Sequence, residues 1–240
     1  MLVTGAGSGI GLAIAERLAS DGWKVLSADL RTENVVGTPF MADLTTREGN
    51  RGAVDAALDA FGRLDAVVPV AGFQHVSPIE DFDEDRWDAI VAILLTSPFL
   101  LAKYAWASLR ESGEGRFVPI ASAHGLVASP FKAAYVSAKH GVVGLCKTLA
   151  LEGAEHGISA CPVCPAYVRT PLVEMQIADQ AKVHGMSEDR VLEEVILAPQ
   201  AVKRLIEPNE VAATVAFLLS PDGRSFTGAP ITMDQGWSAR

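Results

Sequence analysis

The sequence has few cysteines, no excess of positive charge and no apolar run long enough for a membrane span. Its 240 residues include 29 acidic and 20 basic residues, which gives a net charge of −9. This balance argues against nucleic acid as a partner, because nucleic-acid phosphates attract basic surfaces. The most apolar run, residues 89–102, is too short to cross a bilayer and contains Pro98. We therefore expect no membrane partner and place this run inside a long buried helix.

The three cysteines, Cys146, Cys161 and Cys164, are too few for a disulfide framework. Cys161 and Cys164 form a C-x-x-C, but no further Cys/His cluster completes a metal site, so we expect no metal. The motif lies in a strand-like run, whereas a redox pair normally opens a helix. Buried free thiols are the favoured interpretation, and they are consistent with a cytoplasmic protein.

No linker, internal repeat or low-complexity tract divides the chain, so residues 1–240 are predicted to form a single domain. No signal peptide is visible, because the chain starts directly in an apolar, strand-like segment. That segment is short, which leaves open a longer natural N-terminus. The spacing of apolar runs and helical patterns favours a parallel, doubly wound α/β sheet.

A glycine-rich turn opens the chain between this strand and a helix-like run. Residues 4–11 read Thr-Gly-Ala-Gly-Ser-Gly-Ile-Gly, with Gly5, Gly9 and Gly11 spaced G-x3-G-x-G. Strand, glycine turn and helix are the context that a dinucleotide site requires. Glycines let the backbone approach a pyrophosphate, and the helix N-terminus faces its charge. An ordinary glycine-rich turn is the alternative.

A second motif combines Tyr135 and Lys139, which share one face of a helix because they are four residues apart. A nearby ammonium lowers the pKa of a phenol and prepares it for proton transfer to or from a carbonyl or alcohol oxygen. Ser122 ends the apolar run 116–121 and could hydrogen-bond the same reacting oxygen. A helix with a surface lysine and a core tyrosine would give the same spacing.

Together the two motifs resemble the short-chain dehydrogenase/reductase family, with its T-G-x3-G-x-G loop and its Y-x3-K pair, and the resemblance covers essentially the whole chain. It implies a single-domain Rossmann-type fold: a doubly wound, parallel, seven-stranded sheet flanked by helices, with a helical substrate lid at about residues 172–200. A plain pair of surface helices is the alternative for the lid. The resemblance also implies a homotetramer built on the helices around residues 83–109 and 132–155.

Asp29 ends the second predicted strand, at the distance from the glycine loop where a carboxylate binds the adenosine ribose. A carboxylate there repels a 2′-phosphate, so we predict NAD rather than NADP; a solvated loop acid is the alternative. The resemblance implies that Asp43 contacts adenine with Leu44 beside it, and that Thr170 and Val168 hold the nicotinamide carboxamide. The predicted cofactor-binding residues are Gly5, Ser8, Gly9, Ile10, Gly11, Asp29, Asp43, Leu44, Ala71, Gly72, Tyr135, Lys139, Pro165, Val168 and Thr170.

The implied reaction is hydride transfer between the nicotinamide and a secondary carbinol carbon. Tyr135 takes the hydroxyl proton during oxidation, and Ser122 orients the substrate oxygen. Lys139 lowers the pKa of Tyr135 and binds the nicotinamide ribose. These three residues are the predicted catalytic set.

Within the family, residues 73–82, 121–132 and 170–176 resemble the D-3-hydroxybutyrate dehydrogenases. This second resemblance implies a small 3-hydroxy acid as substrate, whose carboxylate meets the charge of Lys132 and hydrogen-bond donors around it. The predicted substrate-binding residues are Gln74, Ser122, His124, Lys132, Tyr135, Gln176 and Trp237. Taken singly, a solvated lysine, surface amides, a packed histidine and a terminal packing tryptophan are the alternatives.

Several positions depart from the family pattern. Pro69-Val70-Ala71-Gly72 replaces the usual N-N-A-G, and Leu94 replaces an asparagine that holds a water linked to the active-site lysine. Pro69, Pro119 and Pro162 fall in strands that should be central, where proline cannot donate a ladder hydrogen bond.

Three hypotheses therefore remain. The first is an NAD-dependent 3-hydroxybutyrate dehydrogenase or a relative acting on another small hydroxy or keto acid. The second, favoured by Leu94 and the altered N-N-A-G, is a low-activity nucleotide-binding sensor or subunit. The third is a ketoreductase for a bulkier substrate, which Asp29 and the polar lid disfavour.

Overall fold

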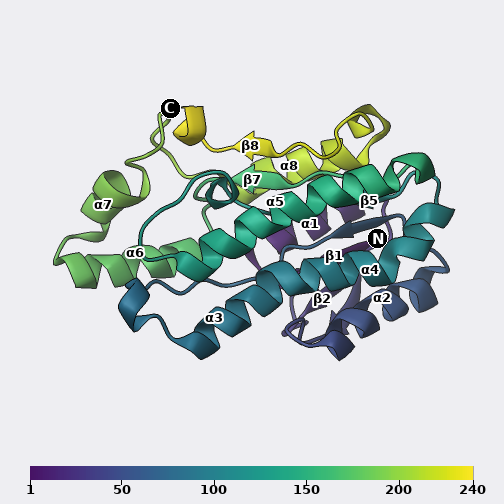
Figure 1. Cartoon of the computed structure of the whole chain (residues 1–240), viewed down its shortest axis with the longest axis horizontal. Coiled ribbons are helices and arrows are strands. Elements are labelled where there is room, and N and C mark those ends of the chain that lie inside the picture. The colour runs from purple at the N-terminus through teal and green to yellow at the C-terminus, as the bar shows by residue number, and fades with distance from the viewer. Residues whose placement is uncertain (240) are drawn as a thin grey trace.

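A six-stranded parallel sheet forms the centre of the computed structural model, which describes residues 1–239 apart from the side chains at 179–180 and 182–184. The strand order is β3-β2-β1-β4-β5-β6, the doubly wound arrangement predicted from the sequence (Figure 1). The strands are β1 (Leu2–Thr4), β2 (Leu26–Asp29), β3 (Thr38–Met41), β4 (Ala66–Val68), β5 (Arg116–Phe117) and β6 (Ser159–Ala160).

Helices cover both faces of this sheet and bury two separate apolar cores (Figure 1). On one face, α1 (Gly9–Ser20) packs against α8 (Pro208–Leu219). On the other lie α2 (Arg47–Phe61), α4 (Ser97–Glu111) and α5 (Ala133–Gly153). Short 3-10 turns occur at Ile79–Asp81, Ala123–Gly125, Ala154–His156, Pro221–Gly223 and Trp237–Ala239.

The prediction of seven strands in one sheet is wrong in the number of strands, because the main sheet has six. The strand-like run that contains Cys161 and Cys164 is divided at Pro162 into β6 and β7 (Val163–Pro165), and β7 pairs with β8 (Ile231–Met233) as a separate two-stranded sheet. A single bridge between Ile120 and Val163 links this pair to the main sheet. The physical reason is that proline has no N–H and interrupts the regular ladder.

The three strand prolines are tolerated because their carbonyls still accept ladder hydrogen bonds. Pro69 O accepts from Ile120 N at 2.8 Å, and Pro119 O accepts from Val163 N at 3.0 Å. Pro162 O accepts from Ile231 N at 2.9 Å, so each proline removes a donor without separating the strands. Beside Pro162, the Cys161 thiol donates to Ala229 O at 3.1 Å.

The long helix expected at residues 83–109 is present but changes geometry in the middle. It consists of α3 (Glu84–Val91), a π-helical segment (Ala92–Thr96) and α4. The π-helical segment lies just before Pro98, which cannot donate an α-helical hydrogen bond. The stretch Glu84–Glu111 is long and apolar enough to cross a membrane by composition, but half of its most apolar window is buried in this protein. That burial is typical of a core helix.

The predicted lid region forms a small helical unit of its own. It contains α6 (Pro171–His184), α7 (Glu188–Val191) and a π-helical segment (Leu192–Ile196). These elements share a separate apolar cluster that includes Val173, Val191 and Ile196. Figure 1 shows α6 and α7 at one end of the molecule, beyond the sheet.

Candidate active site

The glycine loop between β1 and α1 forms a backbone cradle. Gly5 has a φ of +64°, and a Cβ there would lie 2.8 Å from the Ala71 backbone. A Cβ at Gly11 would lie 2.0 Å from the Gly5 carbonyl oxygen, so a side chain cannot enter without moving the loop. The helix that starts at Gly9 directs its free N–H groups toward this cradle.

A groove with a cavity volume of about 440 Å³ opens over this cradle. Eleven of the predicted cofactor-binding residues line it: Gly5, Ser8, Gly9, Ile10, Gly11, Asp29, Asp43, Leu44, Ala71, Gly72 and Thr170. Asp29 is fixed at the end of β2, because its carboxylate accepts from Gly7 N at 2.9 Å and from Arg31 N at 3.0 Å. The glycine cradle, the helix N-terminus and the strand-end carboxylate fit a dinucleotide.

The three predicted catalytic residues meet at the inner end of this groove. Ser122 begins a 3-10 turn and accepts from His124 N at 3.1 Å. Tyr135 and Lys139 lie in the first two turns of α5, as their spacing predicts. The Lys139 ammonium is buried, donates to Ile120 O at 2.7 Å and lies 5.6 Å from the centre of the Tyr135 ring.

The electrostatics of this set differ from the expectation for Tyr135. Burial raises the pKa of Tyr135, and a hydrogen bond with Ser122 opposes that rise. Burial also lowers the pKa of Lys139 to about 8. The pKa of Tyr135 was expected to be lowered, but in the protein alone it is raised, because burial disfavours the phenolate and the Lys139 ammonium donates to Ile120 O.

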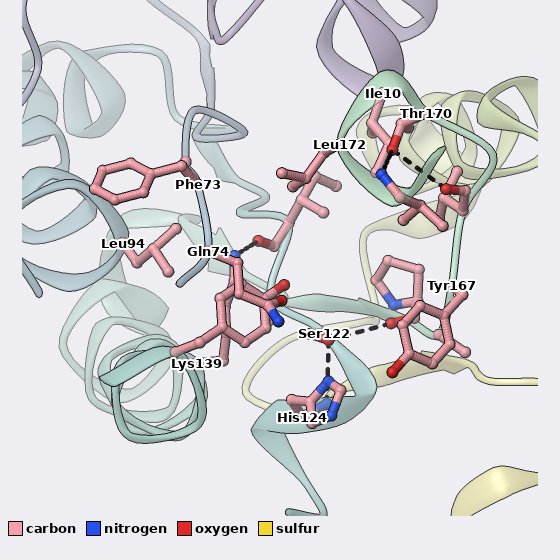
Figure 2. Close-up of a pocket in the computed structure, with 18 of the residues that line it drawn as sticks. Ile10, Phe73, Gln74, Leu94, Ser122, His124, Lys139, Tyr167, Thr170 and Leu172 are labelled. Atoms are coloured by element: carbon pink, nitrogen blue, oxygen red, sulfur yellow. Dashed lines mark hydrogen bonds between the residues drawn. The ribbon is translucent and has the colours of Figure 1, made fainter. Parts of the chain in front are cut away.

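An inner cavity of about 120 Å³ connects the catalytic set to the predicted substrate-binding residues (Figure 2). Gln74, His124, Gln176 and Trp237 line it, together with Pro165, Val168 and Thr170 from the predicted nicotinamide loop. Two buried amide atoms, Gln74 Nε2 and Gln176 Oε1, have no hydrogen-bond partner among the described residues. Buried polar atoms normally have partners, so these two amides favour a polar ligand.

Lys132 is the one predicted substrate-binding residue that does not line the cavity. Its side chain is 5% exposed, and its ammonium donates to the Tyr167 hydroxyl at 2.9 Å. Burial lowers the pKa of Lys132 to about 8. In this structure the ammonium is therefore held by the hydroxyl of Tyr167, a residue that does line the cavity.

His124 is a neutral hydrogen-bonding group in this site. It is 4% exposed, and its Nε2 lies 2.9 Å from Ser129 Oγ. Burial, followed by the positive charges of Lys132 and His140, lowers its pKa to about 3. The imidazole can orient a substrate at neutral pH without adding charge.

Tyr167 is the site residue that the sequence analysis did not identify. Its ring stacks on Trp237 with centroids 5.8 Å apart and an angle of 11° between the planes. It makes a T-shaped contact with His124, with ring centroids 6.3 Å apart, and it lines the same cavity as Ser122 (Figure 2). The available signal was an aromatic side chain in the middle of the nicotinamide loop, residues 165–171.

Comparison with known proteins now gives the family. A family model described as enoyl-(acyl carrier protein) reductase matches residues 5–238. The chain is 43% identical to a D-beta-hydroxybutyrate dehydrogenase of Rhizobium meliloti and 40% identical to one of Cupriavidus necator. Both alignments cover 100% of this chain, with 98% and 97% of the relatives. The chain belongs to the short-chain dehydrogenase/reductase family.

Solved structures of short-chain dehydrogenases/reductases agree with this assignment. The ligand-free aldohexose dehydrogenase of Thermoplasma acidophilum superimposes with a TM-score of 0.92 at 30% identity, over 100% of this chain and 93% of that chain. A short-chain dehydrogenase family protein of Francisella tularensis gives 0.90 at 27% identity, over 100% and 98%. The protein is therefore an oxidoreductase of this family, and the family and fold imply a nicotinamide cofactor, NAD or NADP.

This short-chain dehydrogenase/reductase has a hydrocarbon contact where the family pattern has an asparagine. Leu94 lies in the π-helical segment and is 3% exposed. A Cβ added at Gly72 would lie 2.2 Å from Leu94 Cδ2, so the leucine occupies the space that the glycine leaves open. A leucine side chain cannot hydrogen-bond a water, so the side chain at position 94 does not contribute to a proton path.

Proposed function

We propose that the protein is an NAD-dependent dehydrogenase that transfers hydride between the cofactor and a small 3-hydroxy acid, D-3-hydroxybutyrate being the best candidate. One observation carries the proposal: a single inner cavity joins Ser122, Tyr135 and Lys139 to the polar groups of Gln74, His124 and Gln176. The relatives named D-beta-hydroxybutyrate dehydrogenases, at 43% and 40% identity, support the same substrate.

The chain's own residues supply position and proton transfer. Ser122 orients the substrate oxygen, and Tyr135 accepts its proton during oxidation or returns it during reduction. Bound nicotinamide would supply the hydride acceptor or donor. Lys139 favours the phenolate of Tyr135 once the ammonium faces the phenol rather than Ile120 O. Val168 and Thr170 would hold the nicotinamide side of the groove, and Asp43 with Leu44 the adenine side.

The choice of NAD over NADP rests on Asp29. Its carboxylate is held at the end of β2 by two backbone N–H groups and lines the groove. A ribose hydroxyl can donate to this carboxylate, whereas a 2′-phosphate would place like charges together.

The test is NADH formation followed at 340 nm with D-3-hydroxybutyrate and NAD, beside the L-enantiomer and NADP. Stereospecific, NAD-linked turnover supports the cofactor, the proton-transfer set and the substrate together. Turnover with NADP alone would refute the Asp29 assignment. If neither enantiomer is oxidised, 3-hydroxybutyrate is refuted as the substrate.

A low-activity NAD-binding relative is the second candidate, and the contact between Leu94 and Gly72 is the observation that favours it. It predicts that NAD raises the melting temperature while no hydroxy acid is oxidised at a useful rate. A third possibility is another small hydroxy or keto compound: a 33% identical relative is named cyclohexanol dehydrogenase. Comparing D-3-hydroxybutyrate with cyclohexanol separates these possibilities.

We also propose a homotetramer in the cytoplasm. Phe99 on α4 and Leu151 on α5 are exposed apolar side chains, 46% and 81% accessible, on the helices expected to form subunit contacts. The three cysteines are buried and free, in agreement with the sequence prediction and compatible with a reducing compartment. Light scattering on the purified chain tests the tetramer, and a monomer would refute it.

A further inference from the structure

Asn50 is a polar side chain on the buried face of α2. It is 0% exposed, whereas the other buried residues of this helix, Ala53, Val54 and Ala57, are apolar and belong to the core that α2 shares with α4 and α5. Burying an amide costs free energy unless its polar atoms have partners. The partners of Asn50 therefore indicate why the core contains an amide at this position.

Both polar atoms of the Asn50 amide are hydrogen-bonded. Its Nδ2 donates to Leu44 O at 2.8 Å and to Thr46 O at 2.6 Å, which uses both of its hydrogens. Its Oδ1 accepts from Ser97 Oγ at 2.6 Å. A buried polar network whose members are all satisfied is rigid and favours one arrangement of the elements that it joins.

The two ends of this network lead to two different walls of the dinucleotide groove. Residues 42–45 line the groove on the side proposed for adenine, and Leu44 supplies one of the carbonyls that Asn50 binds. Ser97 begins α4 directly after the π-helical segment, and Ile93 of that segment also lines the groove. Asn50 itself is not among the lining residues, so it acts on a ligand through the walls that it holds.

Hydrogen bonds inside the loop after β3 fix its shape but not its position relative to α4. Asp43 accepts from Thr45 N at 2.9 Å through its carboxylate and from Thr46 N at 3.3 Å through its carbonyl. Neither bond leaves the loop, so neither connects it to the long helix. The bonds of Asn50 make that connection.

We propose that Asn50 is a positioning residue for the adenine half of the cofactor: it braces the wall formed by residues 42–45 against the start of α4, so that this part of the groove is already formed when the ligand arrives. The proposal rests on the proposed function in one respect, because it places adenine beside Asp43 and Leu44. It assigns Asn50 no contact with the cofactor. A preformed wall reduces the entropy cost of binding, since it needs no ordering.

The test measures binding of ADP-ribose by calorimetry. ADP-ribose carries the adenosine and the pyrophosphate but no nicotinamide, so the result depends neither on turnover nor on the identity of the substrate. Asn50→Leu removes all three hydrogen bonds at nearly constant volume. Ser97→Ala removes only the bond that reaches α4.

Each variant has a matched control on its own helix. Val54→Ala, one turn after Asn50 on α2, loses buried apolar volume outside the residues that line the groove. Ser108→Ala on α4 loses a hydroxyl that bonds to the Leu64 backbone, again outside the groove. Both controls report what a loss of stability alone does to binding.

Asn50→Leu should bind ADP-ribose about 10-fold more weakly, and Ser97→Ala about 3-fold more weakly, because the loop loses its fixed position. The double variant should be no weaker than Asn50→Leu, since both substitutions break one network. With D-3-hydroxybutyrate, KM for NAD should rise by similar factors while kcat stays within about twofold, because the proton-transferring residues are untouched. Both controls should bind ADP-ribose like wild type even where their melting temperatures fall.

Three results would overturn the proposal. Wild-type affinity in Asn50→Leu and Ser97→Ala would mean that the network only stabilises the core. An equal loss in Val54→Ala would mean that binding follows stability. Absence of ADP-ribose binding in wild type would remove the adenine site. If Asn50→Leu does not fold, Ser97→Ala beside Ser108→Ala gives the same decision.

Failure of the proposed function would look different. If wild type binds ADP-ribose but does not oxidise D-3-hydroxybutyrate, the proposed substrate is refuted. The binding data still decide the role of Asn50.

Discussion

The dinucleotide groove and the inner cavity are adjacent but are built in different ways. The groove is largely backbone: its cradle comes from one short loop, where Gly5 and Gly11 leave room that a side chain would fill. The inner cavity is made from side chains that four distant segments contribute, among them Gln74, His124, Tyr167 and Trp237. The comparison shows that a site built from contiguous backbone can be identified from spacing, whereas one built from side chains depends on how the whole chain folds.

The largest expected effect separates the chemistry in the cavity from binding in the groove. Tyr135→Phe should lower kcat by about 10²- to 10⁴-fold, because it removes the proton-transferring group. NAD affinity should change little, because the residues around the glycine cradle are untouched. Steady-state kinetics with a fluorescence titration of NADH gives both quantities. Turnover at the wild-type rate would remove Tyr135 from its role.

A change in the groove should instead weaken cofactor binding and leave the proton-transferring group in place. Gly11→Ala places a Cβ 2.0 Å from the Gly5 carbonyl oxygen, so the loop must shift. Overpacking of this kind costs about 1–3 kcal/mol, which corresponds to roughly 10- to 100-fold weaker NADH binding if the strain falls on the cradle.

The matched control is Gly144→Ala in α5, where a Cβ would have no neighbour within 4 Å. This variant should bind NADH normally and unfold at the same or a slightly higher temperature, because alanine favours the helix. Equal effects of the two substitutions would contradict the steric account of the cradle.

The next effect lies within the cavity and depends on pH. Lys132, whose pKa is lowered to about 8 by burial, is charged below that pH and neutral above it. KM for acetoacetate should therefore rise above pH 8 by up to about 10-fold per pH unit, while KM for methyl acetoacetate should not follow. Lys132→Ala should raise KM for acetoacetate at pH 7 and remove the difference between the two pH profiles. Parallel profiles in wild type would argue against a carboxylate recognised through Lys132.

The smallest expected effect concerns the boundary between the two regions. Leu94→Asn introduces a side chain that can hold a water near the active-site lysine, and kcat should rise a few-fold if proton release limits turnover. A solvent isotope effect on kcat, measured for both forms, identifies whether a proton step is limiting. An unchanged or lower kcat would show that another step controls the rate.

The sequence predicted the groove better than the cavity. The spacing of Gly5, Gly9 and Gly11 defines a local backbone shape, and Tyr135 with Lys139 is a local helical pair. All of these residues lie where expected. Lys132 was expected to bind the carboxylate; in the structure it does not line the cavity, and its ammonium donates to the Tyr167 hydroxyl. That contact joins residues 35 positions apart, and no local pattern contains it.

Two other differences have similar causes. The pKa of Tyr135 was expected to fall, but it rises because burial removes water from the phenol and disfavours the phenolate, while Lys139 donates to Ile120 O. The strand count differed because Pro162 removes one donor at the point where β6 would continue into β7. Residues 172–200 were expected to form helices, which they do as α6 and α7, but a static fold does not test whether they act as a lid.

The burial of three basic side chains in the site has a consequence for how the protein responds to acid. The folded state lowers the pKa of His124 to about 3 and the pKa values of Lys132 and Lys139 to about 8. The unfolded chain, with ordinary pKa values near 6.5 and 10.5, then binds more protons between pH 3 and 6.5 and again above pH 8. The free energy of unfolding therefore rises with pH through the first window. The free energy of unfolding rises again just above pH 8. At higher pH the buried thiols, whose pKa values burial raises, lower it, because the folded chain then binds more protons than the unfolded chain. Acidification below pH 6.5 thus favours the unfolded chain through protonation of His124, so this buried cavity residue makes the fold sensitive to acid.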